Sequence, residues 1–173
     1  ESIMCSRIKY QTGTGTVIIG RNMDWTAKMG TKLYVMPKGI ERQGMVEENP
    51  LKWTSKYGSV VSSVWDCSVA DGMNETDLTA RMLYLAETQY GKRDTTRPGL
   101  SVSTWVQYYL DNFTMVAEAV EATHALQICP LEIIHKGGTA DAPQHVSLAD
   151  ASGDSAVIEI LDGKPVIHHD PQY

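Results

Sequence analysis

The chain has 173 residues, 42% of them hydrophobic, and no apolar run long enough to span a membrane. Its 21 acidic and 15 basic side chains leave a net charge of -6, and the scattered basic residues argue against a nucleic-acid interface and favour a small-molecule substrate. The cysteines, Cys5, Cys67 and Cys129, are too few and too widely spaced for a disulfide framework or a Cys-x-x-Cys zinc site. We therefore expect one domain of ordinary size.

The beginning of the chain predicts a β-hairpin. Residues 6–10 alternate polar and apolar side chains, residues 12–16 are rich in glycine and threonine, and residues 17–20 are a short apolar run. Cys5 would then stand at the head of the first strand of this hairpin.

Two further strand candidates follow, at residues 32–36 and 59–65. Turn residues are expected to close each of them, at residues 37–39 for the first and at residues 71–72, an Asp-Gly pair, for the second. Residues 78–86 are ambiguous by period and fit a strand or a helix.

Two helices are expected in the middle of the chain. The apolar side chains of residues 100–112 fall largely on one helical face. Thr114 is expected to cap a second helix, which would run as far as Leu126.

The last part of the chain predicts strands again. Residues 145–148, 155–161 and 166–169 are strand candidates, with turns at residues 152–154 and 162–163. Strands, then a helix pair, then strands indicate an α+β fold with a mainly antiparallel sheet. The sequence contains no internal repeat and no low-complexity linker, which agrees with a single domain.

Three residues near the start of the chain combine the groups of a nucleophilic site. Cys5 precedes the first hairpin strand, and Arg21 and Asp24 directly follow the return strand. Because a hairpin brings its two ends together, a thiol, a cation and a carboxylate are expected in one small volume. Taken singly, Arg21 and Asp24 also fit a plain ion pair, and Cys5 fits a small buried apolar residue.

A cysteine attacks an acyl group as its thiolate, and the reaction also needs a proton acceptor. No histidine lies near these three residues in the sequence. Cleavage of the peptide bond before Cys5 would release an α-amino group, with a reference pKa of about 7.7 to 8.0, beside its own thiol. With Asp24 holding this amine, the three residues predict an N-terminal nucleophile.

Several segments, in one order along the chain, resemble a known family. They are Cys5-Ser6-Arg7, Gly20-Arg21-Asn22-Met23-Asp24-Trp25, Lys52-Trp53-Thr54-Ser55-Lys56-Tyr57-Gly58-Ser59-Val60-Val61, Asp71-Gly72-Met73-Asn74-Glu75, Pro98-Gly99-Leu100-Ser101, Leu110-Asp111-Asn112-Phe113, Ser152-Gly153-Asp154-Ser155-Ala156, and Asp162-Gly163-Lys164 with Val166-Ile167-His168-His169. These segments resemble the choloylglycine hydrolase family, which contains the bile salt hydrolases and the penicillin V acylases. The later ones look most like its Gram-negative penicillin V acylase branch.

The resemblance implies the αββα sandwich of the N-terminal nucleophile (Ntn) hydrolases. Residues 5–173 would be the N-terminal part of that domain, and residues 1–4 a propeptide remnant or a tag. Cys5 would be the nucleophile, Arg21 the residue beside the thiol, and Asp24 the partner of the free amine. Tyr84 falls at a site that contributes to the oxyanion hole in the family, here through its backbone N–H, although an ordinary core aromatic is the alternative.

Further residues are candidates for the substrate pocket. Met23, Tyr34 and Met82 fit a hydrophobic acyl pocket, although such residues are more often plain core. We expect no metal and no cofactor, because the adjacent His168 and His169 would point to opposite faces of a strand.

The activity that the resemblance implies is hydrolysis of a linear amide, with penicillin V as the favoured substrate and 6-aminopenicillanic acid and phenoxyacetate as products. Acyl homoserine lactones and conjugated bile salts are alternatives within the same chemistry, and Tyr84 is the visible discriminator. An alternative of another class is a catalytically silent homologue that binds an acyl ligand, or a subunit whose role is assembly.

The chain departs from the family pattern in two respects. Residues 1–4 precede Cys5, whereas the family's nucleophile is the first residue of the mature chain. Family members also continue beyond the point that matches Tyr173, where they hold an oxyanion asparagine and a second active-site arginine. We therefore expect that activity needs a C-terminal segment. The resemblance also implies a homotetramer in the periplasm, with the cytoplasm as the alternative.

Overall fold

The computed structural model describes residues 5–25, 28–135, 138–141 and 143–171. Its largest element is a seven-stranded sheet with strand order β15-β14-β13-β8-β7-β6-β3, in which all neighbouring strands are antiparallel. These strands are β3 (Lys32–Met36), β6 (Ser59–Val64), β7 (Ser68–Asn74), β8 (Thr79–Tyr84), β13 (Gln144–Ala149), β14 (Ser155–Leu161) and β15 (Lys164–His169). Two runs of consecutive strands, β6 to β8 and β13 to β15, thus meet at the central β8–β13 pair.

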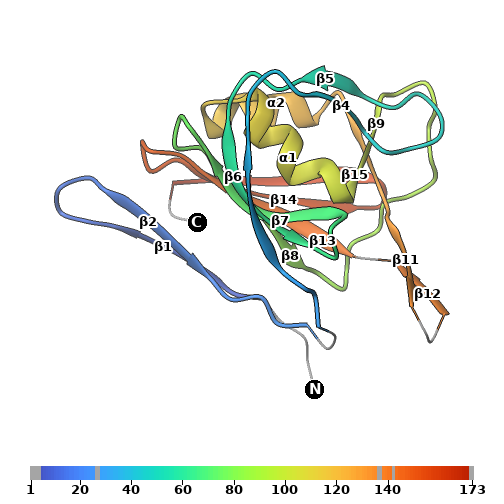
Figure 1. The fold of residues 1–173 in the computed structure, drawn as a ribbon, viewed down its shortest axis with the longest axis horizontal. Coiled ribbons are helices and arrows are strands. Elements are labelled where there is room, and N and C mark those ends of the chain that lie inside the picture. Colours follow the sequence, from blue (N-terminus) through green and yellow to red (C-terminus); the bar gives the residue numbers. More distant parts are fainter. Residues whose placement is uncertain (1–4, 26–27, 136–137, 142, 172–173) are drawn as a thin grey trace.

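Two helices, α1 (Val102–Asn112) and α2 (Val116–Thr123), cover one face of this sheet (Figure 1). The hydrophobic core lies between the two layers. Trp105 and Tyr109 of α1 are fully buried there with side chains of the sheet such as Val61, Val146 and Ile158. No helix in the described part of the chain is long and apolar enough to cross a bilayer.

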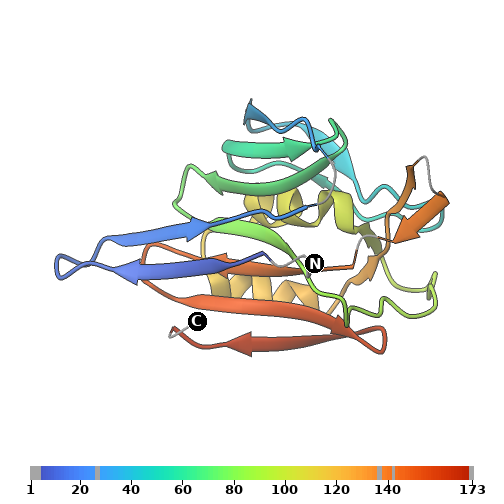
Figure 2. The ribbon, with the colours of Figure 1, turned by 90° about the horizontal axis from the view of Figure 1, so that it is seen from below.

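A hairpin of β1 (Arg7–Gln11) and β2 (Val17–Arg21) lies on the opposite face of the sheet (Figures 1 and 2). Charged side chains anchor it there. Nη2 of Arg7 donates to Oγ of Ser155 at 2.8 Å, and Nζ of Lys9 donates to the carbonyl of Gly153 at 2.8 Å. The hairpin is therefore attached to the sheet by charge-assisted hydrogen bonds, which are stronger than those between neutral groups.

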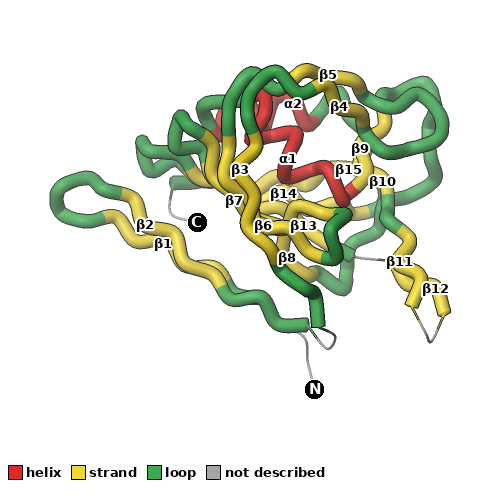
Figure 3. The backbone as a smooth tube through the Cα atoms, in the orientation of Figure 1, coloured by secondary structure: helices red, strands yellow, loops and turns green. Residues whose placement is uncertain are grey.

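In the described part of the chain, three further short strand pairs flank the main sheet (Figure 3). They are β4 (Glu41–Gln43) with β5 (Lys52–Thr54), β9 (Gly99–Ser101) with β10 (Gln127–Cys129), and β11 (Glu132–His135) with β12 (Gly138–Asp141). The sequence predicts none of them, because three or four residues are too few to show a period. The first helix accordingly begins at Val102 rather than at Leu100, which belongs to β9.

The main elements expected from the sequence are confirmed. The hairpin, the strand over residues 32–36 and the strand over residues 155–161 have the expected bounds to within a residue. The ambiguous residues 78–86 form a strand, β8, that is paired on both sides. The α+β class with a mainly antiparallel sheet is also confirmed.

The turn expected at residues 71–72 is wrong, because both residues lie inside β7. The chain instead reverses at Trp65 and Asp66, which have positive φ angles of 53° and 55°. Gly72 is needed for close packing rather than for a turn. A Cβ there would lie 2.6 Å from Cδ1 of Leu110 in α1 and 2.9 Å from the carbonyl oxygen of Val60.

The start expected for the second helix is also wrong, since its N-cap is Met115 rather than Thr114. The carboxylate of Glu118 accepts the N–H groups of both of these residues, at 3.0 Å for Thr114 and 3.3 Å for Met115. Oδ2 of Asp150, which is remote in sequence, accepts the N–H of Val116 at 2.9 Å. A tertiary contact therefore helps to cap the start of this helix. The helix ends at Thr123, before the expected Leu126.

Gly72→Ala is expected to destabilise the protein by about 1 to 3 kcal/mol, because the new methyl group meets a backbone carbonyl that cannot rotate away. The measurement is the free energy of unfolding in urea for the protein that contains these residues. Gly13→Ala is the matched control, since nothing lies within 4 Å of the corresponding Cβ position. Equal stabilities for the two variants would show that Gly72 is not needed for packing.

Candidate active site

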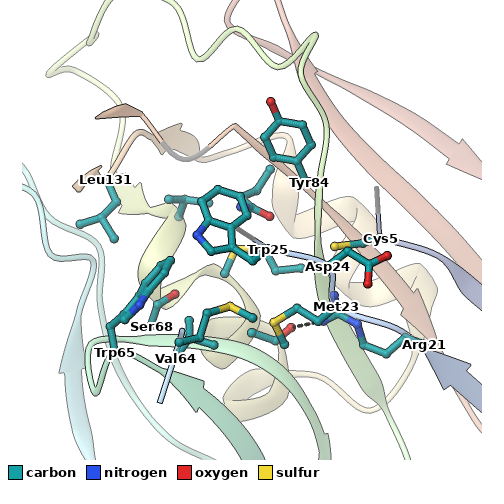
Figure 4. Close-up of a pocket in the computed structure, with 15 residues that line it drawn as sticks. Cys5, Arg21, Met23, Asp24, Trp25, Val64, Trp65, Ser68, Tyr84 and Leu131 are labelled. Atoms are coloured by element: carbon teal, nitrogen blue, oxygen red, sulfur yellow. Dashed lines mark hydrogen bonds between the residues drawn. The ribbon is translucent and has the colours of Figure 1, made fainter. Parts of the chain in front are cut away.

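A pocket lies where the open end of the β1–β2 hairpin meets the β6–β7 reversal and the ends of β8 and β13, with a cavity volume of about 50 Å³. Figure 4 shows Cys5, Asp24 and Arg21 at one end of this pocket and Trp65 and Leu131 at the other. The lining residues are Cys5, Arg21, Met23, Asp24, Trp25, Met29, Val64, Trp65, Ser68, Ala70, Met82, Tyr84, Val102, Leu131 and Gln144. The cysteine, arginine and aspartate singled out in the sequence are thus brought together in one largely apolar pocket.

The register of the hairpin explains how Cys5 reaches Arg21. Arg7 and Arg21 are directly opposite in the β1–β2 ladder. The N–H of Asn22 donates to the carbonyl of Ser6 at 3.0 Å, which extends the pairing one residue beyond the ladder. Cys5 is the next residue outward, so it lies diagonally across from Arg21, at a separation that long side chains can span.

Asn22 ties the two ends of the hairpin to the acidic group of the site. Its Oδ1 accepts the N–H of Ser6 at 2.5 Å, and its Nδ2 donates to Oδ2 of Asp24 at 3.0 Å. One amide side chain therefore fixes both the strand that carries Cys5 and the carboxylate of Asp24. The role of Asn22 is not visible in the sequence, because only the folded hairpin shows which groups it joins.

Arg21 is directed toward the sheet as well as the pocket. Its side chain is 9% exposed, its Nη1 donates to the carbonyl of Ala70 at 3.3 Å, and the same nitrogen lies 3.8 Å from Oδ2 of Asp71. The alternative of a plain Arg21–Asp24 ion pair is not observed among the described residues, where the carboxylate partner of Arg21 is Asp71.

Asp71 is shared by two arginines, since Nε of Arg81 lies 3.3 Å from its Oδ1. Burial raises the pKa of Asp71, and the charges of Arg81 and Arg21 oppose that rise. Burial also lowers the pKa of Arg81; Asp71 opposes this shift, and the charge of Arg21 reinforces it. This partner of the site was not predicted, because the Asp71-Gly72 pair is typical of a turn.

Aromatic rings line much of the remaining pocket. The ring of Trp25 lies edge-on to that of Trp65, with centroids 6.1 Å apart, and to that of Tyr84, with centroids 5.9 Å apart. Such edge-to-face contacts stabilise a fixed arrangement of rings. Trp65 was missed in the sequence because it reads as the end of a strand.

The structure separates the three pocket candidates proposed from the sequence. Met23 and Met82 line the pocket. Tyr34 does not line it, and its hydroxyl donates instead to Oδ1 of Asp66 at 3.1 Å. Tyr84 lies at the end of β8, opposite Gln144 of β13, and both residues line the pocket.

The described residues include no group of three or more histidine, cysteine, aspartate or glutamate side chains that could hold a metal ion. The two adjacent histidines of β15 contact different carboxylates. His168 lies 3.5 Å from Glu159, and His169 lies 2.8 Å from Asp154.

Comparison with known proteins yields one family and several relatives. The sequence profile "Linear amide C-N hydrolases, choloylglycine hydrolase family" matches residues 5–173. The chain is 42% identical to the "Penicillin V acylase" of Pectobacterium atrosepticum, over 99% of the chain and 48% of that protein. It is 26% identical to the "Bile salt hydrolase/transferase" of Clostridium perfringens, over 90% of the chain and 48% of that protein.

Solved structures of penicillin V acylase and bile acid hydrolase also match the chain. The structure of penicillin V acylase from Agrobacterium tumefaciens matches with a TM-score of 0.86 and 46% identity, over 96% of the chain and 50% of that structure's chain. A mutant of conjugated bile acid hydrolase from Clostridium perfringens matches with a TM-score of 0.79, over 96% of the chain and 51% of that structure's chain, and at 24% identity it supports the fold alone. The chain spans about half the length of the curated relatives it matches.

We expect His145 to make the free energy of unfolding dependent on pH. Burial lowers its pKa below the ordinary 6.5; Glu159 opposes this shift and Arg21 reinforces it. The unfolded chain therefore binds a proton near pH 6.5 that the folded chain does not bind until lower pH, so the free energy of unfolding decreases as the pH falls below about 6.5. His145→Gln should remove this part of the decrease, as measured by urea unfolding between about pH 8 and about pH 5. An unchanged pH dependence in the variant would contradict the assignment.

Proposed function

Because the chain belongs to the linear amide C–N hydrolases of the choloylglycine hydrolase family, we propose that it is the N-terminal half of an enzyme that hydrolyses penicillin V to 6-aminopenicillanic acid and phenoxyacetate. The expected fold, part of an Ntn hydrolase, is confirmed by the match to relatives of that class. The complete enzyme would consist of these residues joined to a C-terminal second half.

The observation that carries the proposal is the grouping of Cys5, Arg21 and Asp24 at one end of an apolar pocket. Cys5 is half-buried, so its thiol is within reach of a ligand in the pocket. The other cysteines are less suitable nucleophiles. Cys67 is exposed outside the pocket, and burial raises the pKa of the Cys129 thiol.

The proposed base is the α-amino group of Cys5 itself. Removal of residues 1–4, which lie outside the described residues, would free this amine beside the thiol. Asp24, held by Asn22, would orient the amine through a charge-assisted hydrogen bond. Arg21 would favour the thiolate by its positive charge.

The proposed reaction has two steps. The amine takes the thiol proton, the sulfur attacks the acyl carbonyl carbon, and the C–N bond breaks as the proton passes to the leaving amine, which leaves a thioester on Cys5. Water then attacks the thioester carbon and gives one proton to the amine. The C–S bond breaks, the acid departs and the thiol regains its proton.

The developing oxyanion needs donors fixed in advance. We propose the backbone N–H of Tyr84 as one donor, because this residue ends β8 at the pocket. Further donors would come from the second half of the complete enzyme.

The aromatic side chains support an aromatic acyl group such as phenoxyacetyl. Trp25, Trp65 and Tyr84 offer ring faces and edges to such a group, and Met23 and Met82 supply adaptable apolar contacts. The present cavity of about 50 Å³ is well below the range of about 300 to 1,000 Å³ found for small-molecule sites. We infer that the second half supplies the remaining walls of the substrate site.

Exposed apolar side chains indicate where a second half would pack. Leu33 and Val35 of β3 are 76% and 79% exposed, and Val60 of β6 and Met73 of β7 are exposed beside them. These four residues lie on the sheet face that also carries the hairpin. A continuous apolar surface of this kind is characteristic of an interface rather than of a solvated sheet.

From the family resemblance we also propose that the complete enzyme is a homotetramer and that it is located in the periplasm. Cell fractionation and the native mass of the purified protein test these two assignments separately.

Replacement of single cysteines tests the nucleophile. Cys5→Ala is expected to abolish penicillin V hydrolysis by the complete enzyme, whereas Cys67→Ala and Cys129→Ala should leave the rate within about twofold of the wild type. The rate of phenoxyacetate release is the measurement. An active Cys5→Ala enzyme would exclude Cys5 as the nucleophile.

Removal of residues 1–4 tests the base. While they are attached, the nitrogen of Cys5 is an amide without a usable lone pair, so the complete enzyme should be inactive. Specific removal of these residues, verified by intact mass, should switch hydrolysis on. Equal activity before and after removal would refute the α-amino group as the base.

A further inference from the structure

A buried cluster of charges links the hairpin to the sheet. We call Arg7, Arg21, Asp71 and Arg81 the interlayer charge cluster. Arg7 and Arg21 are cross-strand partners in the hairpin, and Asp71 and Arg81 are cross-strand partners in the sheet. The cluster contains three guanidinium groups and one carboxylate, all at least half-buried, so its positive charges outnumber its negative charge.

Asp71 is the bridge within this cluster. Its Oδ2 lies 3.8 Å from Nη1 of Arg21, and its Oδ1 lies 3.3 Å from Nε of Arg81. The side chains of Arg21 and Arg81 are 9% and 10% exposed, so solvent does little to screen one guanidinium from the other. The carboxylate therefore both attracts Arg21 and shields it from Arg81.

The same arginine is the cation of the pocket, where it lines the wall with Cys5. The other charged or titratable groups around it are Asp24 in the pocket, Arg7 across the hairpin and His145 on β13. Asp24 is bound to Asn22 and makes no described ion pair with Arg21. Two carbonyls also hold the Arg21 guanidinium, that of Asn22, 3.1 Å from Nε, and that of Ala70, 3.3 Å from Nη1. Among the described residues, Asp71 is the carboxylate that forms an ion pair with this guanidinium.

We propose that Asp71 is a positioning residue that holds Arg21 beside Cys5, both by attracting its guanidinium and by shielding it from the repulsion of Arg81. This proposal rests on the proposed function in one respect, namely that Arg21 acts on the Cys5 thiol. Asp71 does not line the pocket and acts through Arg21. The carboxylate of a sheet strand thereby sets the charge next to a thiol carried by the hairpin.

The test is the pH profile of Cys5 alkylation by iodoacetamide in the complete enzyme, with the labelled residue identified by peptide mapping. Asp71→Asn keeps the shape of the side chain but removes its charge. It should shift the profile to higher pH and slow alkylation near neutral pH by about tenfold, because a thiolate loses the support of a nearby cation. A merely structural role would change the melting temperature and leave this profile in place.

Arg81→Met leaves the Asp71–Arg21 pair intact and should change the alkylation rate by less than about twofold. Asp71→Asn combined with Arg81→Met should recover part of the tenfold loss, because the unshielded repulsion is gone. Asp162→Asn, in the β14–β15 turn, is the matched control and should behave as the wild type. A wild-type profile in a folded Asp71→Asn protein would overturn the proposal.

If Asp71→Asn alone does not fold, the comparison of Arg81→Met with the double variant decides, because these two proteins differ only in the Asp71 carboxylate. Slower alkylation in the double variant supports the proposal, and equal rates overturn it. Alkylation needs no amide turnover. A protein that shows the predicted profiles but hydrolyses no penicillin V would therefore refute the proposed function and leave the positioning role standing.

Discussion

The site depends on how the β1–β2 hairpin is attached to the sheet. Arg7 donates a hydrogen bond to β14, and Lys9 donates one to the chain between β13 and β14. Arg21 lies beside Asp71 of β7. Long charged side chains connect the hairpin to the sheet, whereas the main hydrophobic core lies on the other face of the sheet. Because the register of the hairpin is fixed, this attachment also fixes the end that carries Cys5.

The charged side chains that attach the hairpin to the sheet also set the charge beside Cys5. Burial lowers the pKa of Arg81. Burial, reinforced by the charge of Arg81, also lowers the pKa of Arg7, to about 10. One carboxylate, Asp71, is shared by Arg21 and Arg81. The cation beside Cys5 is thus part of a larger electrostatic arrangement that spans both layers. A change in the sheet can then alter a thiol on the hairpin without any contact between the two.

Local patterns in the sequence predicted the hairpin, the main strands, and the meeting of Cys5, Arg21 and Asp24, because these follow from alternation and from hairpin closure. The partner of Arg21 could not be predicted, since Asp-Gly reads as a turn and only the approach of α1 explains Gly72 inside a strand. Trp65 and Asn22 were likewise missed, because their roles arise from contacts across the pocket. The cap from Asp150 on α2 is equally long-range.

The central claim is that Cys5 forms a covalent acyl intermediate. The most direct measurement is intact-mass and peptide-mass analysis of the complete enzyme, quenched with acid during turnover of penicillin V. The account predicts a phenoxyacetyl thioester on the peptide that begins at Cys5, which disappears as the substrate is consumed. Turnover without any adduct on Cys5, or with the adduct on Cys67 or Cys129, would contradict it.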